Sequence, residues 1–351
     1  SKDTGTILPY PKSGGNVETP RAVQKEARGT CWVGYQQKGM KKKGDKMVPN
    51  CVPENYDVNE HIEELTEQDD KKKMKKVVLV TGEYAQRNYT VFDIIGLKGK
   101  RQLTKTLPFL IEEAEAAEQA GIDTMNIRYN PERPEIAKQL REAAPNTFMS
   151  FAKPMQSAKS KTDALRFAFD AMEMGADSII CGTWSLDFIE TVAKAGIPAE
   201  GHLGLVPRKS TWTGGLRAVG KTIEQAKKLF DDLKTLENVG AWAAEIEVIP
   251  SEILAILSPS TSLITSSIGG GKGDIQFLFA EDILGDSAGP FPRHSKQYTD
   301  LFSVRETMQS MRVKAFSDFI EDVKNDGFPS EEYEVGVEDS VKSQLQEYIT
   351  K

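Results

Sequence analysis

From Val77 onward, short apolar runs alternate with amphipathic helical segments, and this alternation restricts the possible folds more than any other feature of the chain. Eight runs have the length and composition of strands: VVLVTG, DTMNIRY, TFMSFA, DSIICG, PAEGHLG, AWAAEIEVI, SLITSSIG and IQFLFAED. The segments between them repeat apolar residues at helical spacing, and three end at Gly121, Gly175 and Gly196. Since strands joined by helices form parallel sheets, the pattern predicts an α/β fold, a (β/α)8 TIM barrel over about residues 77–290.

Residues 1–75 differ in composition, because they are rich in Lys, Gly and Pro and have few apolar residues at regular spacing. This composition predicts a partly extended N-terminal arm. Within it, GTCWVGYQQKGMKKKGDKMVPNCVPEN has Trp32, Tyr35 and Val48 at positions that suit a small hairpin-like clasp. That stretch resembles a short segment of marine phage and bacterial proteins of unassigned role, and the resemblance implies no chemistry.

The second predicted domain, residues 76–351, consists of the barrel and a C-terminal tail. The tail contains one long amphipathic helix, DLFSVRETMQSMRVKAFSDFIEDVKNDG. Its apolar residues suit packing against the barrel or a neighbouring subunit, so we expect a homo-oligomer. These residues are Phe302, Met308, Met311 and Phe316.

The net charge of -7 argues against a nucleic-acid-binding protein, since phosphate binding needs a positive surface. The basic clusters KGMKKKGDK and KKKMKK flank an acidic stretch and are interpreted as solvated charge in the arm. No apolar run approaches 18 residues, and the first residues lack the pattern of a signal peptide. We therefore expect a cytoplasmic protein with neither nucleic-acid nor membrane partners.

Function in such barrels resides at the carboxyl ends of the strands. The predicted ends carry Glu83, Arg128, Tyr129, Ala152, Lys153, Cys181, Gly182, His202 and Glu247, followed by SIGGGKGD. The sequence GGGKGD lacks the spacing of a phosphate-binding loop and has no Ser or Thr after its lysine, so we interpret it as a tight turn.

Four motifs occur in a fixed order: GIPAEGHLGLVPRKSTWTGG, EIEVIPSEI, SSIGGGKGDIQFLFAEDILG and FSDFIEDVKNDGFPSEEYE. Together they closely resemble the ketopantoate hydroxymethyltransferase family, which belongs to the phosphoenolpyruvate mutase and isocitrate lyase superfamily. The likeness runs from about Ala144 to Val335 and more loosely back to Val77. It implies transfer of a hydroxymethyl group from methylenetetrahydrofolate to 3-methyl-2-oxobutanoate, on the route to pantothenate. The expected partner is thus a small 2-oxoacid, with tetrahydrofolate as the possible one-carbon carrier.

The resemblance also implies a site chemistry in which a carboxylate base removes a proton and Mg2+ polarises the oxoacid. Glu247 matches the basic glutamate of the family, and His202 matches another active-site position. These two residues are the candidate catalytic residues.

The metal ligands of the family, by contrast, have no counterparts at the matching positions. Those positions hold Tyr129, Ala152, Ile180 and Gly182. None of them offers the hard carboxylate oxygen that Mg2+ prefers, so the expectation is that no metal is bound.

The candidate substrate-binding residues are Lys153, Arg128, Tyr129 and Glu83. Because side chains alternate along a strand, Arg128 and Lys153 are expected to point outward, beside inward Tyr129 and Ala152. Strand ends relax this rule, so Lys153 or Arg128 could replace the metal as a cationic clamp, or could have only a structural or surface role. Glu83 is expected near the end of the first strand.

Two hypotheses remain open. Glu247 and His202 favour an enzyme acting on a 2-oxoacid, metal-independent or altered in substrate. Both residues could instead have a structural role in hydrogen bonding. Glu245 lies two positions before Glu247, and two inward carboxylates need hydrogen-bonding partners. Loss of the family ligands favours a non-catalytic scaffold whose arm mediates binding.

Overall fold

The computed structural model describes residues 35–43, 46–53, 74–153, 158–182 and 184–351. The chain divides into two units, residues 1–71 and 72–351. In the first unit, β1 (Tyr35–Lys43) and β2 (Lys46–Pro53) pair as an antiparallel hairpin whose register shifts between Gln37 and Met40. The predicted clasp of side chains lies outside the described residues.

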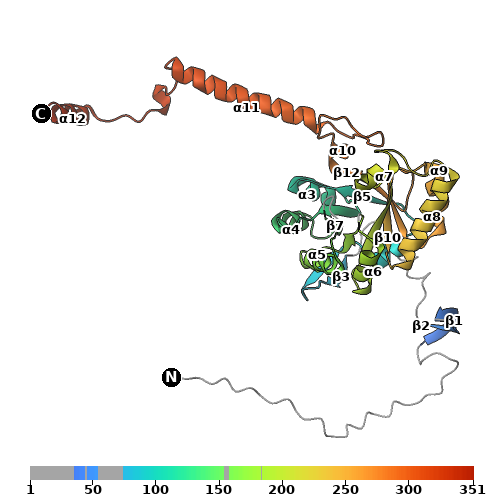
Figure 1. Cartoon of the computed structure of the whole chain (residues 1–351). Coiled ribbons are helices and arrows are strands. Elements are labelled where there is room, and N and C mark those ends of the chain that lie inside the picture. Colours follow the sequence, from blue (N-terminus) through green and yellow to red (C-terminus); the bar gives the residue numbers. More distant parts are fainter. Residues whose placement is uncertain (1–34, 44–45, 54–73, 154–157, 183) are drawn as a thin grey trace, which may run out of the picture. The chain divides into compact units, whose positions relative to one another are not determined.

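The second unit contains the predicted barrel, and its fold class is confirmed (Figure 1). Eight parallel strands close the sheet, each bonded to the next and the last to the first. The strands are β5 (Leu103–Leu107), β6 (Thr124–Arg128), β7 (Phe148–Ala152), β8 (Ser178–Ile180), β9 (Ala199–Gly204), β10 (Ala243–Glu247), β11 (Ile264–Ile268) and β12 (Ile275–Phe279).

The first strand of the barrel differs from the prediction. The run VVLVTG begins in β3 (Lys75–Val78), which forms a two-stranded antiparallel hairpin with β4 (Tyr84–Arg87). The barrel instead starts at β5, whose sequence LTKTL has no continuous apolar run. Arg87 forms an ion pair with Asp177 and donates to the carbonyl of Pro145, so the hairpin packs beside the loops that enter β7 and β8. This position is the amino-terminal end of the barrel.

Helices follow the strands and cover the outside of the barrel (Figure 1). They are α3 (Ile111–Gln119), α4 (Pro134–Ala143), α5 (Lys161–Glu173), α6 (Leu186–Lys194), α7 (Ser210–Thr213), α8 (Ile223–Asn238), α9 (Ser251–Leu257) and α10 (Ala280–Leu284). Between β11 and β12 the chain makes the predicted tight turn, in which Gly269 and Gly271 have positive φ angles of 67° and 87°.

Apolar side chains stabilise the barrel in two layers and in a small cluster of Leu107, Ile268 and Phe277. The larger layer lies between strands and helices and includes Met125, Phe151, Phe167 and Leu233. A smaller layer closes the amino-terminal end, where α2 (Val91–Gly96) and its neighbours pack against the first residues of several strands. The carboxyl end is thereby left as the accessible end of the barrel.

The C-terminal tail forms α11 (Leu301–Lys324) and α12 (Asp339–Ile349). A long helix is thus present where the sequence predicts one, but neither α11 nor α12 has a buried residue. Within the described part of the chain, no helix combines the length and apolar character needed to cross a membrane.

Candidate functional site

Polar side chains occupy the middle of the barrel, where such folds commonly place branched apolar residues. The ammonium of Lys105 on β5 lies 2.7 Å from Oε1 of Glu200 on β9. Asn126 on β6 donates to Glu245 on β10 over 3.2 Å. Since neither pair joins neighbouring strands, both contacts cross the interior. These four side chains therefore face inward. Because side chains alternate along a strand, the residues two positions away on the same strand face inward as well.

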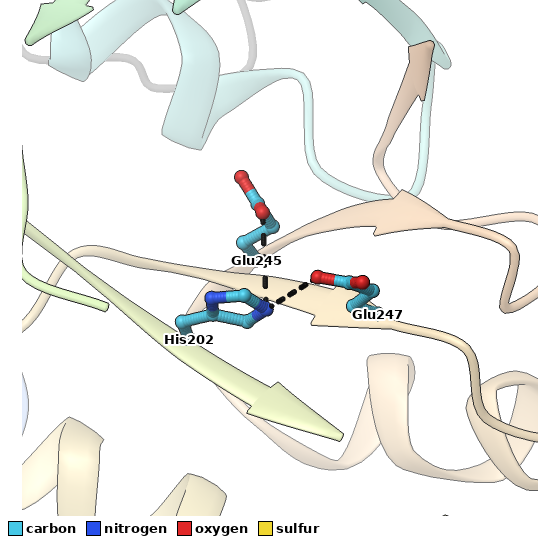
Figure 2. A group of neighbouring side chains, drawn as sticks. All are labelled: His202, Glu245 and Glu247. Carbon is cyan, nitrogen blue, oxygen red and sulfur yellow. Dashed lines mark ion pairs between the residues drawn. The ribbon is translucent and has the colours of Figure 1, made fainter. Parts of the chain in front are cut away.

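Three ionisable side chains, one of them Glu245 of this layer, converge toward the carboxyl ends of β9 and β10. Figure 2 shows His202 from β9 beside both carboxylates from β10, with dashed lines from the imidazole to each of them. Nε2 of His202 lies 3.0 Å from Oε2 of Glu247 and 3.8 Å from Oε1 of Glu245. The register explains the proximity, because His202 is the direct partner of Glu245 in the parallel pairing.

The charges of this group influence one another. Burial lowers the pKa of His202, but the adjacent carboxylate of Glu247 and the charge of Glu245 outweigh burial, so the net pKa is raised. Burial also raises the pKa of Glu245, and His202 and Lys105 oppose that rise only partly. A neutral Glu245 or a compensating cation is thus favoured here.

The backbone around the group is shaped for close packing. A side chain at Gly204 would meet the carbonyl oxygen of Glu247 at 2.2 Å, so only glycine lets β9 end against β10. A Cβ at Gly182 would stand 3.0 Å from Cβ of His202 and 3.1 Å from its Nδ1, so this glycine leaves space for the imidazole. Val248, directly after Glu247, has a φ of 48°, a strained conformation for a β-branched residue.

The group has the composition of a site for a divalent cation. One ligand atom from each of His202, Glu245 and Glu247 lies within 4.8 Å of the others. The approach of Glu247 to Nε2 of His202 falls short of hydrogen-bond geometry, and this buried nitrogen has no other acceptor among the described residues. One imidazole and two carboxylates suit ions such as Mn2+, Co2+ or Zn2+, and the carboxylates also suit Mg2+. The residues present therefore fit a divalent cation.

Fold and site together define the class: a (β/α)8 barrel with its ionisable group at the carboxyl ends of the strands, as in TIM-barrel enzymes. Residues 123–331 match the sequence profile of ketopantoate hydroxymethyltransferase. Because that match covers more than half of the chain, the chain belongs to the ketopantoate hydroxymethyltransferase family.

Curated relatives carry the same description. The 3-methyl-2-oxobutanoate hydroxymethyltransferase of Kosmotoga olearia is 32% identical over 259 residues, which are 68% of this chain and 94% of that protein. The enzyme of the same name from Caldivirga maquilingensis is 29% identical over 71% of this chain and 98% of its own length. Among solved structures, a phosphonopyruvate hydrolase in complex with oxalate and Mg2+ has a TM-score of 0.40 and 10% identity, over 75% of this chain and 97% of that chain.

The expectation that no metal is bound is wrong as stated. It considered only the four positions where the family carries its ligands, whereas His202, Glu245 and Glu247 form a metal-capable group from β9 and β10 alone. Glu245 is the residue that changes the outcome, because it adds a second inward carboxylate directly beside His202.

The structure reverses the expected directions of Arg128 and Tyr129. Tyr129 packs against Phe151 and Phe167, with ring centroids 5.8 and 5.4 Å away, and so faces the helices. Arg128 is two residues after inward Asn126 and lies over the ring of Phe109 at 4.5 Å, at the mouth. Because Asn126 faces inward, Arg128 two residues later does so as well, and no pattern in the sequence marked Asn126 as an inward residue.

The other predicted residues lie in three places. Lys153 is on the helix side of the barrel, 5.8 Å from the ring of Phe167. Ser150 is the direct partner of inward Asn126, so Ser150 and Ala152, two residues later, both point inward, as predicted for Ala152. Cys181 is buried in the outer apolar layer, which leaves Gly182 on the inner side. Glu83 is exposed and immediately precedes β4, at the opposite end of the barrel from the mouth.

Four inward residues were missed from the sequence: Lys105, Asn126, Glu200 and Ser266. Each is a polar residue in the middle of a strand and not at its end, and this position is the feature that could have identified it. Among the described residues, Oδ1 of Asn126, Oε2 of Glu200 and the hydroxyls of Ser150 and Ser266 are buried without a hydrogen-bond partner. The interior is therefore more polar than the sequence reading anticipated.

Proposed function

We propose that this protein is an enzyme that transfers a hydroxymethyl group to 3-methyl-2-oxobutanoate or a closely related 2-oxoacid, with methylenetetrahydrofolate as donor. The observation that carries the proposal is the convergence of His202, Glu245 and Glu247 at the mouth of the barrel. Family membership supports the reaction class. A cytoplasmic location is part of the same proposal, since both substrates are water-soluble metabolites.

In the proposed mechanism, Glu247 is the general base that takes the proton from C3 of the oxoacid. Its carboxylate is the member of the group nearest the strand end, whereas Glu245 is anchored deeper by Asn126. His202 and Glu245 would hold a divalent cation, which supplies Lewis-acid polarisation of the substrate carbonyl. Arg128 at the mouth is placed to attract the substrate carboxylate.

The overall step is balanced without an oxidant or reductant. C3 of the oxoacid forms a bond to the methylene carbon of the donor, and both bonds from that carbon to the donor nitrogens break. Water supplies the new hydroxyl group. The C3 proton and the second proton of the water end on the two nitrogens, giving tetrahydrofolate.

The test measures deuterium exchange at C3 of 3-methyl-2-oxobutanoate, which reports removal of the proton without the donor. The wild type with Mg2+ or Mn2+ should catalyse exchange, and Glu247→Gln should lower the rate about a hundredfold or more. Calorimetric titration separates the roles: Glu245→Gln should lose Mn2+ affinity, whereas Glu247→Gln should retain most of it. Absence of exchange with every 2-oxoacid and metal tested would favour the alternative, a non-catalytic scaffold.

The proposal also includes a homo-oligomer. Three apolar side chains of α11, Met311, Phe316 and Phe319, are 66%, 70% and 51% exposed. Exposed apolar groups of this size on one helix are typical of protein interfaces. Light scattering should give a multiple of the chain mass of 38.9 kDa, and Met311→Gln with Phe316→Gln should reduce it, whereas Lys314→Gln on the same helix should not.

A further inference from the structure

A buried ammonium lies across the barrel interior from the cation group, by which we mean His202, Glu245 and Glu247. Lys105 is on β5, which stands opposite β9 in the closed sheet, and its Nζ lies 2.7 Å from Oε1 of Glu200. Glu200 precedes His202 by two residues on β9, so both side chains point inward. Burial raises the pKa of Glu245, and the charge of Lys105 opposes that rise. Lys105 is therefore coupled to the cation group as well as to its own partner.

A gain in stability does not account for the pair of Lys105 and Glu200. Removal of two charges from water costs about as much free energy as their attraction returns, so apolar side chains of similar volume stabilise a core equally well. Oε2 of Glu200 is also buried and has no hydrogen-bond partner among the described residues. An unpaired buried acceptor adds a further cost. These features are expected if the charges of the pair act on a third partner.

The charges inside the barrel match the charge of one kind of ion. Strand alternation places these charged side chains inward: Lys105, Arg128, Glu200, Glu245 and Glu247. Arg128 lies at the mouth and has its own counter-charge in Glu281. With His202 neutral, as a metal ligand has to be, the three negative charges of the glutamates and the one positive charge of Lys105 leave a net formal charge of −2. A divalent cation neutralises this charge, whereas a trivalent cation leaves an excess positive charge in a buried site.

We infer that Lys105 and Glu200 set the charge that the cation group presents, and thereby make it selective for divalent over trivalent ions such as Fe3+. The inference rests on the cation site of the proposed function. Lys105 acts through its field and not as a ligand, because an ammonium has no lone pair to offer. In the interior of a protein, one nearby charge changes the affinity for an ion by a large factor, and its effect grows with the charge of that ion.

The experiment measures the affinity for Mn2+ and for Tb3+, a redox-inert trivalent ion, by calorimetric titration at pH 7 in a buffer without phosphate. Lys105→Met leaves one more negative charge beside the cation group, so it should tighten Mn2+ about tenfold and Tb3+ about thirtyfold. Glu200→Gln removes a negative charge and should weaken the two ions by about the same factors. The double variant Lys105→Met, Glu200→Leu loses one charge of each sign, so both affinities should stay within about threefold of the wild type.

Two control variants complete the design. Lys194→Met removes the same charge from the chain at an exposed ion pair, so it should change neither affinity. Glu245→Gln removes a proposed ligand and should abolish the binding of both ions at the cation group. Each variant is checked in EDTA for a cooperative melting transition above the temperature of the titration. If Lys105→Met fails this check, Glu200→Gln and the double variant still isolate the charge of Lys105, because both lack the carboxylate of Glu200.

The outcome for Lys105 is distinguishable from the outcome for the reaction, which deuterium exchange at C3 reports. A ratio of Tb3+ to Mn2+ affinity that does not follow the charge in these variants would overturn the inference, as would a wild type that binds neither ion. Exchange by the wild type with such a constant ratio would refute the role of Lys105 and keep the proposed function. A ratio that follows the charge, without exchange of any 2-oxoacid, would support the role of Lys105 and refute the proposed enzyme.

Discussion

Replacement of Lys105 by methionine tests the polar interior of the barrel. The side chains of Lys105 and Glu200 are 2% and 0% exposed, and their charged atoms are 2.7 Å apart. Methionine fills similar space but leaves Glu200 with an uncompensated buried charge, which typically costs about 3–5 kcal/mol. In a domain of this size, each kcal/mol lowers the melting temperature by roughly 2–4 °C. We therefore expect Lys105→Met to melt on the order of 10 °C below the wild type.

Scanning calorimetry at pH 7.5 in EDTA measures the effect. The double variant Lys105→Met, Glu200→Leu removes both charges and should recover most of the loss, since well-packed apolar side chains replace a buried pair at little cost. Lys194→Met is the matched control, because Lys194 pairs with Glu190 on the surface and exposed pairs contribute little. A Lys105→Met protein that melts within about 2 °C of the wild type would refute the reasoning.

Four further predictions concern separate parts of the molecule. Burial raises the pKa of Glu245, so ionisation of this carboxyl destabilises the fold at high pH. Glu245→Gln should therefore raise the melting temperature in EDTA at pH 8. The gain should shrink as the pH falls toward 4.5, the ordinary pKa of a glutamate. An equal gain at pH 4 would contradict this. Gly182→Ala should displace His202 and weaken Mn2+ binding about tenfold, measured by electron paramagnetic resonance, and unchanged affinity would argue against the contact. Because burial raises the pKa of the Cys181 thiol, a thiol reagent should label it slowly in the native state and rapidly in urea. Limited proteolysis should remove residues 1–74 and leave the barrel folded; loss of the melting transition after this cleavage would refute the boundary.

Much of the barrel could be predicted because the spacing of apolar residues distinguishes its strands from its helices. Strands such as Phe148–Ala152 are buried on both faces and appear as continuous apolar runs, and the helices between them end at glycine. The first strand was missed for the opposite reason. In LTKTL two threonines and a lysine separate the two leucines, so no apolar run marks the strand. The inward lysine can be buried there because it pairs with a glutamate 95 residues away. No local pattern reveals such a partner.

The candidate site was predicted in part. His202 and Glu247 were identified from motifs, and the structure brings them together. The predicted directions of Arg128 and Tyr129 were the reverse of those observed. When both faces of a strand are buried, its own residues do not show which side chains point into the barrel. Glu245 was noted as a buried charge in need of a partner, but its place beside His202 follows from the pairing of β9 with β10, which only the fold provides.

The separation of the barrel into an apolar shell and a polar centre affects how this chain can change during evolution. Side chains between strands and helices form the larger apolar layer, whereas the inward positions at the mouth, such as Ala152 and Gly182, belong to neither apolar layer. Exchange of Ala152 or Gly182 therefore removes no contact from those layers. Residues at such positions can therefore change with little loss of apolar packing in the shell that stabilises the barrel.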